Sequence, residues 1–204
     1  MPETRERWRY RLPHWEVAGR PHFVTIRCAG SLPEDVQARL REIQANLDRI
    51  ASSSPQFATL QRQYFLTCEK HLDQGGGFAP FHLPVASDVV FAAFDRLPSA
   101  AGWRVRDAVA MPNHVHLLLV PMAACPAPLR RMIPRLKGQV AHEANRVLGR
   151  RGVFWQPDWF DRWMRDDAEE MRTVAYIRQN PVKACLVREW RIWPWLRTRE
   201  SSAG

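Results

Sequence analysis

Residues 103–121, WRVRDAVAMPNHVHLLLVP, contain two strand-like stretches separated by a turn. Trp103–Ala110 and Val115–Val120 are rich in residues that favour strands. Met111-Pro112-Asn113 lies between them, and its proline and asparagine favour a turn. The apolar run Leu117–Val120 indicates that the second strand continues into a buried sheet.

Upstream of this pair, the sequence predicts one further strand and three helices. His22–Cys28 alternates apolar and polar residues and predicts a strand. Residues 33–77 predict a helical hairpin inserted after that strand, broken by SSSP at 52–55 and ended by three glycines. Residues 85–97 predict a compact apolar helix.

Downstream, two more helices follow. Leu129–Leu148 predicts a long basic helix interrupted early by Pro134, and Asp166–Asn180 predicts a last helix that Pro181 stops. This order of strands and helices predicts an α+β fold, an antiparallel sheet with helices packed on one face. We expect one domain over 1–200, with 33–77 as a helical insertion and 188–204 as a Trp-rich tail.

Composition points to a basic intracellular protein. The 204 residues carry 30 Lys+Arg against 21 Asp+Glu, a net charge of +9, and nine tryptophans. Arginine supplies nearly all of the positive charge and its fork suits phosphate, so a nucleic acid is the first partner to expect; a basic but unrelated enzyme is the alternative. Four cysteines without a CxxC pair, no apolar run near ~18 residues and a charged N-terminus predict a cytoplasmic protein with no membrane partner.

The N-terminal segment 5–20 interleaves five arginines, Arg11 among them, with Trp8, Tyr10 and Trp15. Such a mixture suits a nucleic-acid strand, because the charges follow phosphates and the rings stack on bases. An arm that packs Trp8 and Trp15 on the core is an equal alternative.

His114 and His116 are the sharpest local feature. Side chains two apart in a strand point to the same face, so the two imidazoles can hold one metal ion. The alternative is a pair of sheet histidines hydrogen-bonded to the backbone.

Tyr176 and Asn180 are four residues apart and share one helix face. Asn180 could give an oxygen to the same metal, and Tyr176 could attack phosphorus with help from a metal that polarises the phosphoryl oxygens. The alternatives are a helix cap before Pro181 for Asn180 and a half-buried packing residue for Tyr176.

Three blocks in this order resemble the REP-associated tyrosine transposases of the HUH single-strand transposase superfamily. They are MPNHVHLLLVP, LKGQVAHEANRVLGRRGVFWQPDWFDRWMRDDAEEM and YIRQNPVKACLV, and the resemblance runs from about Arg11 to Val187. It implies a ferredoxin-like fold, a metal site at His114, His116 and Asn180, and Tyr176 as the nucleophile. Cys185 departs from the family, where a glycine is usual, and this puts the local turn in doubt.

The implied activity is metal-dependent cleavage and rejoining of single-stranded or hairpin DNA, typically palindromic repeats, through a 5′-phosphotyrosine. The resemblance implies Mg²⁺ or Mn²⁺, which we prefer to Zn²⁺ although two imidazoles alone favour zinc, copper or nickel. We expect basic residues of 129–151 to hold the DNA backbone, Lys137 being the closest contact unless it is only a solvated helix charge. These residues are Arg130, Arg131, Arg135, Lys137, Arg150 and Arg151.

Two other functions compete. One is a non-catalytic protein that binds hairpin DNA or RNA on the same fold. The other is a zinc-dependent hydrolase, which lacks a recognisable glutamate base beside the two histidines. The presence of His114, His116 and Tyr176 together favours the transposase-type enzyme, and the oligomeric state, monomer or homodimer, stays open.

Overall fold

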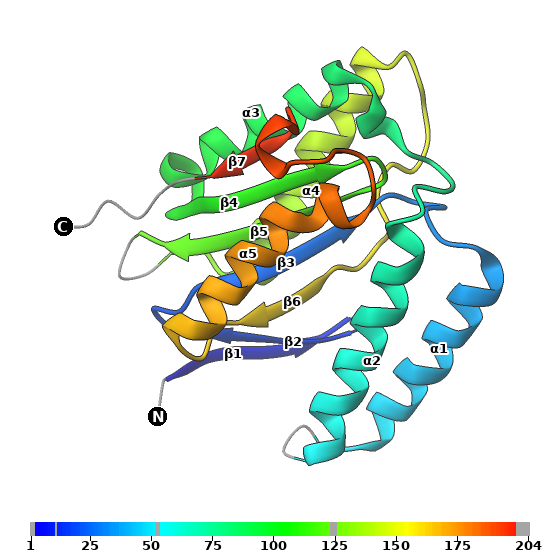
Figure 1. Cartoon of the computed structure of the whole chain (residues 1–204). Coiled ribbons are helices and arrows are strands. Elements are labelled where there is room, and N and C mark those ends of the chain that lie inside the picture. Colours follow the sequence, from blue (N-terminus) through cyan, green and yellow to red (C-terminus); the bar gives the residue numbers. More distant parts are fainter. Residues whose placement is uncertain (1–2, 11, 52–53, 123–125, 199–204) are drawn as a thin grey trace.

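A five-stranded antiparallel sheet is the centre of the molecule (Figure 1). The computed structural model describes residues 3–10, 12–51, 54–122 and 126–198. The strand order is β6-β3-β5-β4-β7, so β5 with the two histidines is the middle strand. The strands are β3 (His22–Arg27), β4 (Trp103–Met111), β5 (His114–Pro121), β6 (Phe160–Trp163) and β7 (Leu196–Thr198).

The alternation of side chains along β5 divides the sheet into two faces. Val115, Leu117 and Leu119 enter the largest apolar core, which α3 (Pro84–Ala101) and α4 (Leu129–Val147) cover. Leu118 belongs to a second core on the opposite face, together with residues of α5 (Asp167–Lys183). The predicted α+β class with an antiparallel sheet is confirmed.

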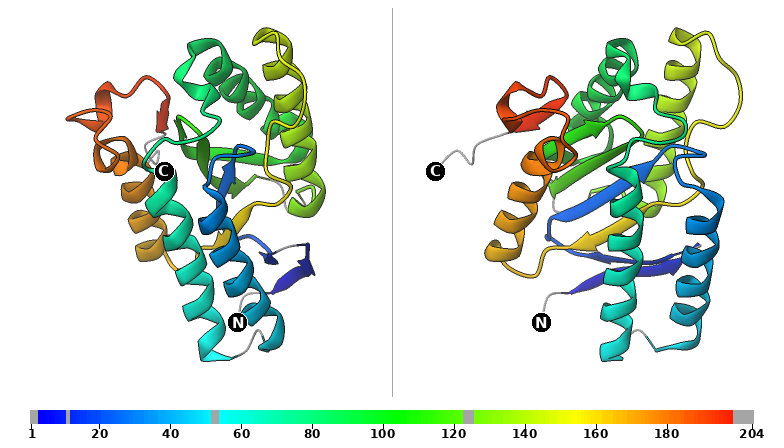
Figure 2. Two further views of the ribbon diagram at one scale, coloured as in Figure 1. Left: turned by 90° about the vertical axis from the view of Figure 1, so that its right-hand side faces the viewer. Right: turned by 45° about the vertical axis from the view of Figure 1, so that its right-hand side comes forward.

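The prediction that helices pack on one face is wrong in one respect. Helices α3 and α4 lie on one side of the sheet and α5 lies on the other (Figure 2). The reason is that both faces of the middle strands are apolar or buried, and a sheet buried on both sides needs cover on both.

The predicted hairpin over 33–77 is present as α1 (Glu34–Arg49) and α2 (Pro55–Leu72). The two helices pack on each other through small apolar clusters of their own. Phe65 of α2 also reaches the second core of the sheet, 5.8 Å from Phe23 between ring centroids. At the base of the hairpin, Gly77 has a positive φ and passes so close to the backbone of Gly30 that no side chain fits there. The hairpin is thus held over the α5 face of the sheet.

The N-terminal arm forms a second, two-stranded sheet from β1 (Thr4–Arg9) and β2 (Pro13–Val17). Trp8 packs against the large core and stacks on His14 with ring centroids 5.1 Å apart. Trp15 is half-buried and lies 5.7 Å from Trp163. Both tryptophans therefore pack on the protein, as the second alternative for this arm expects; Arg11 lies outside the described residues.

Two helices continue through prolines that the sequence analysis treated as breaks. Pro134 is inside α4, and Pro181 is inside α5, which ends at Lys183 instead of Asn180. Asn180 is therefore not the helix cap. The cap is Ala184, and Cys185 follows with a left-handed φ of 57°. The amides of Cys185 and Leu186 bond to the carbonyls of Val182 and Pro181, the pattern of a Schellman motif.

After α5 the chain forms a short 3-10 turn, η2 (Trp190–Ile192), and then β7 on the edge of the sheet. Trp193 donates its indole N–H to the carbonyl of Ala110 at 3.0 Å, which ties the tail to β4. Residues 199–204 of the predicted tail lie outside the described residues. Among the helices that the structure describes, none is long and apolar enough to cross a membrane.

Candidate active site

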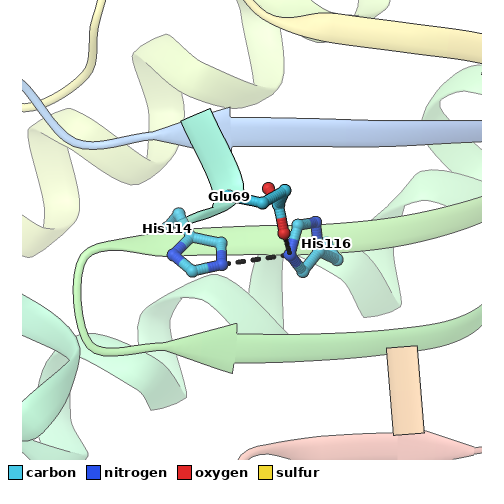
Figure 3. A group of neighbouring side chains, drawn as sticks. All are labelled: Glu69, His114 and His116. Carbon is cyan, nitrogen blue, oxygen red and sulfur yellow. Dashed lines mark hydrogen bonds and ion pairs between the residues drawn. The ribbon is translucent and has the colours of Figure 1, made fainter. Parts of the chain in front are cut away.

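Strand β5 presents His114 and His116 to the α5 face, with Nε2 of one imidazole 3.0 Å from Nε2 of the other (Figure 3). Each Nδ1 is engaged behind the ring, at 2.8 Å from Asn113 Oδ1 and at 2.9 Å from Thr25 Oγ1. Such outer contacts fix the ring orientation and direct both Nε2 atoms to one point, where they could bind one metal ion. The alternative of sheet histidines bonded to the backbone does not describe these contacts, which are all to side chains.

Both histidines are completely buried. Burial and the neighbouring His116 lower the pKa of His114 to about 3. His114 is therefore neutral at physiological pH, and a neutral imidazole is the form that binds a metal.

Glu69 of α2 completes the cluster, and the sequence analysis missed it (Figure 3). Its Oε2 lies 3.3 Å from His116 Nε2, and the ligand atoms of Glu69, His114 and His116 lie within 4.8 Å of one another. Burial acts to raise the pKa of Glu69, but interactions with His116, His114 and Tyr176 outweigh it and lower the pKa. This buried set of two imidazoles and a carboxylate could bind a divalent metal.

Tyr176 of α5 donates its phenol hydrogen to Glu69 Oε2. Its ring is enclosed by other rings, with centroids 5.3 Å from His116, 5.8 Å from Phe23 and 5.9 Å from Phe65. Burial and the carboxylate of Glu69 raise the pKa of Tyr176 far above its ordinary value. The structure thus brings Tyr176 to the two histidines, with a neutral phenol in this state.

Asn180 lies one turn after Tyr176 and is completely buried. Its amide is beside the phenol, where it acts against the rise in the pKa of Tyr176. Neither Oδ1 nor Nδ2 of Asn180 has a hydrogen bond of normal geometry to a described residue. A buried amide without partners is costly, so this position suits a residue that binds an additional group.

The structure differs from expectation at Lys137. Its side chain is buried and the ammonium donates to three backbone carbonyls, Gln156 at 2.6 Å, Pro157 at 2.8 Å and Asp158 at 3.1 Å. These bonds use all three of its N–H groups, so Lys137 fixes the 156–158 loop and is not placed to contact phosphate.

The predicted arginines have different surroundings. Arg130, Arg131, Arg135 and Arg151 are exposed, and Arg130 pairs with Glu6 at 2.6 Å. Arg150 is half-buried and stacks on the ring of Phe78 at 3.9 Å. Helix α4 covers the face of the sheet opposite to the histidines. Its arginines are therefore separated from the candidate site by the sheet itself.

Comparison with solved structures finds a protein with a similar fold. A structure of a REP-associated tyrosine transposase bound to a REP hairpin is similar over 90% of this chain and 79% of the other, with a TM-score of 0.51 and 16% identity. No protein-family model and no curated protein matches the chain. At this identity the likeness is one of fold, and the chain shares the overall fold of that transposase.

Proposed function

We propose that this protein cleaves and rejoins single-stranded or hairpin DNA, with Tyr176 as the nucleophile. One observation carries the proposal: the phenol of Tyr176 meets the buried cluster of Glu69, His114 and His116. These groups come from α5, α2 and β5 of a fold similar to that of a tyrosine transposase bound to a hairpin. The convergence of a nucleophile with a metal-ligand set supports phosphoryl transfer.

In the proposed reaction, the Tyr176 oxygen attacks a backbone phosphorus and the bond from phosphorus to the 3′ oxygen breaks. The phenol proton passes to Glu69, which already accepts its hydrogen bond. That proton passes from Glu69 through water to the leaving 3′ oxygen, which becomes a free 3′-OH and leaves Glu69 ionised again. The 5′ phosphate stays on Tyr176 as a phosphodiester, and attack by a 3′-OH reverses the step and rejoins the strand.

A divalent cation fits the donor set of His114, His116 and Glu69, and the unpartnered oxygen of Asn180 offers a fourth ligand. Such a cation polarises the phosphoryl oxygens. We propose Mg²⁺ or Mn²⁺, because carboxylate and amide oxygens with substrate phosphate form an oxygen-rich site.

Glu69 also removes one objection to a zinc hydrolase, since a glutamate does lie beside the two histidines. Two histidines and a glutamate are the ligands of some zinc hydrolases. The two functions differ in their product. A zinc hydrolase releases both DNA ends, whereas a tyrosine nucleophile keeps the 5′ end attached to the protein.

The test uses a hairpin DNA with labelled single-stranded flanks, incubated with the protein and Mg²⁺ or Mn²⁺. We expect a slow band that survives denaturant, is digested by protease and maps to Tyr176 by mass spectrometry. Tyr176→Phe abolishes this band, because the substitution removes only the attacking oxygen and keeps the packed ring. Tyr10→Phe is the matched control, since Tyr10 is exposed in the N-terminal arm and away from the candidate site, and it retains the band.

Excess chelator stops formation of the adduct in the proposed mechanism. Cleavage without an adduct in Zn²⁺ would instead support the hydrolase. Binding of the hairpin without cleavage in any of the three metals would support the non-catalytic binding protein. An adduct that persists in Tyr176→Phe would refute the proposed nucleophile.

A further inference from the structure

A cavity of about 90 Å³ lies between the helical hairpin and the sheet, directly beside the candidate site. Thr25 and Glu69 line the cavity, and both also contact the imidazole of His116. By the ~10–15 Å³ that one water needs, the space accepts roughly six to nine water-sized groups. This is the scale of one planar ring with its exocyclic groups, and too small for a folded segment of nucleic acid.

The polar side chains in the wall of the cavity are of types that hydrogen-bond to flat ligands. Arg27 projects from β3 onto the hairpin side, and its guanidinium contacts the hydroxyl of Tyr64. Gln37 and Gln44 of α1 and Gln156 of the loop add amide groups. Guanidinium and amide groups can form two hydrogen bonds at once with the edge of a base.

Among the described residues, several buried polar atoms around this cavity have no hydrogen-bond partner. Arg27 Nη1 and Trp159 Nε1 are buried donors without a hydrogen-bond partner, and Glu69 Oε1 is a buried acceptor without one. All three residues line the cavity. Buried polar groups left unpaired destabilise a fold. A ligand that supplies donors and acceptors here would pair these groups and gain binding free energy.

Aromatic rings form much of the remaining wall. Tyr64 and Phe65 come from α2, Trp159 precedes β6, and Phe160 is the first residue of that strand. Phe65 and Phe160 lie 4.8 Å apart between centroids, and Phe65 also contacts Tyr176 at 5.9 Å. Aromatic side chains in a basic protein are the usual surface against which an unpaired base packs.

We infer that this cavity binds one unpaired nucleobase of the DNA strand, held under the helical hairpin beside the reacting phosphate. The inference rests on the proposed function, which it deepens by giving the inserted hairpin a role in substrate selection. A paired base does not fit, because the space accepts a single ring system and its hydrogen-bonding edge must be free. Arg41 is exposed and lines the same cavity, so its guanidinium could contact the phosphates of the bound strand.

The test measures binding in excess chelator, so that cleavage does not enter. The probes are hairpin DNAs whose single-stranded flank is dA, dC, dG, dT or an abasic sugar-phosphate chain. We expect the abasic flank to bind roughly five- to hundredfold more weakly than the preferred base, the loss of one stacked and hydrogen-bonded base. A single abasic site moved along the preferred flank then causes the loss at one position only.

Arg27→Met removes the guanidinium while keeping the length of the side chain, and it should make the four base flanks bind alike. Arg39→Met is the matched control, since Arg39 is exposed on α1 and lines a different hollow. It leaves the base preference unchanged. If Arg27→Met does not fold, photo-crosslinking of 5-iodo-substituted flanks to the wild-type chain gives the same information, with the crosslink expected in 64–65 or 159–160.

Binding that does not distinguish the abasic flank from the others would overturn this inference and leave the proposed cleavage standing. A crosslink confined to other parts of the chain would do the same. Absence of binding to every probe would remove both this inference and the proposed function. Loss of the Tyr176 adduct with base-dependent binding intact would remove only the proposed chemistry.

Discussion

Replacing Lys137 with methionine tests whether this lysine supports the fold or holds DNA. The ammonium bonds to three carbonyls of the 156–158 loop within 3.1 Å. Burial lowers the pKa of Lys137 to about 8, and the carboxylate of Asp158 opposes that shift. Methionine preserves the buried stem, so the change isolates the loss of these bonds.

The expected loss of stability follows from the number of bonds. A hydrogen bond from a charged donor contributes about 1.5–3 kcal/mol, and removing the burial cost of the ammonium offsets part of the sum. We therefore expect Lys137→Met to lower the free energy of unfolding by about 2–4 kcal/mol. For a chain of this size, that corresponds to a fall in Tm of roughly 4–16 °C.

The assay combines thermal unfolding with DNA binding across NaCl concentrations. A lost phosphate contact on a single strand changes the log–log salt slope by about 0.7, and we expect no such change for Lys137→Met. Arg131→Met, exposed on the same helix, is the control for a surface cation and should leave Tm unchanged. An unchanged Tm with a reduced salt slope would show that Lys137 contacts phosphate, contrary to this reasoning.

Three further predictions concern the metal site, pH and the end of α5. Glu69→Gln should weaken Mn²⁺ binding at least tenfold by calorimetry while the protein stays folded, because one of three ligands loses its charge; unchanged affinity would exclude Glu69 as a ligand. Burial acts to lower the pKa of His14, but hydrogen bonds with Asp158 and Asp161 outweigh it and raise the pKa to about 9. Since this folded pKa exceeds the unfolded value of about 6.5, the stabilisation is complete below pH ~6.5 and is lost towards pH 9, on the order of 3 kcal/mol. Denaturant titrations should show the decline, and His14→Gln should remove it. Cys185→Gly should raise the unfolding free energy by about 0.5–1 kcal/mol, because Cys185 has a left-handed φ of 57°, and a lower Tm would contradict this.

Most of the fold could be predicted because its signals are local. The strands on either side of Met111-Pro112-Asn113 and the two helices of 33–77 follow from side-chain periodicity and turn residues within a short window. Strands β6 and β7 were missed, since they are only four and three residues long and exist through pairing with β3 and β4. The assignment of Pro181 as a break failed for the opposite reason. Packing of Asn180 and Pro181 in the interior outweighs the local preference to end the helix.

Only part of the candidate site could be predicted from the sequence. His114 and His116 are two residues apart, and Tyr176 and Asn180 are four apart, so a strand period and a helix period predict each pair. Glu69 lies 45 or more residues from any of them along the chain, and no pattern links it to β5. A signal did exist within α2, where Glu69 stands between buried Cys68 and Leu72. A carboxylate on the apolar face of a helix is rarely without a partner.

The position of Glu69 changes how the helical insertion is understood. Helices α1 and α2 have apolar clusters of their own, so their fold does not require a charged residue pointing at the sheet. Burying a carboxylate is unfavourable unless hydrogen bonds and opposite charges compensate, and here the compensation comes from His116 and Tyr176. The insertion therefore contributes a side chain to the candidate site in addition to covering it. The sheet has two faces with different tasks: α3 and α4 bury the larger core on one, while α2 and α5 bring the ionisable groups together on the other. If the proposed function holds, a strand of DNA must reach Tyr176 from the α2 and α5 side, and the arginines of α4 could hold only DNA that continues around the edge of the sheet.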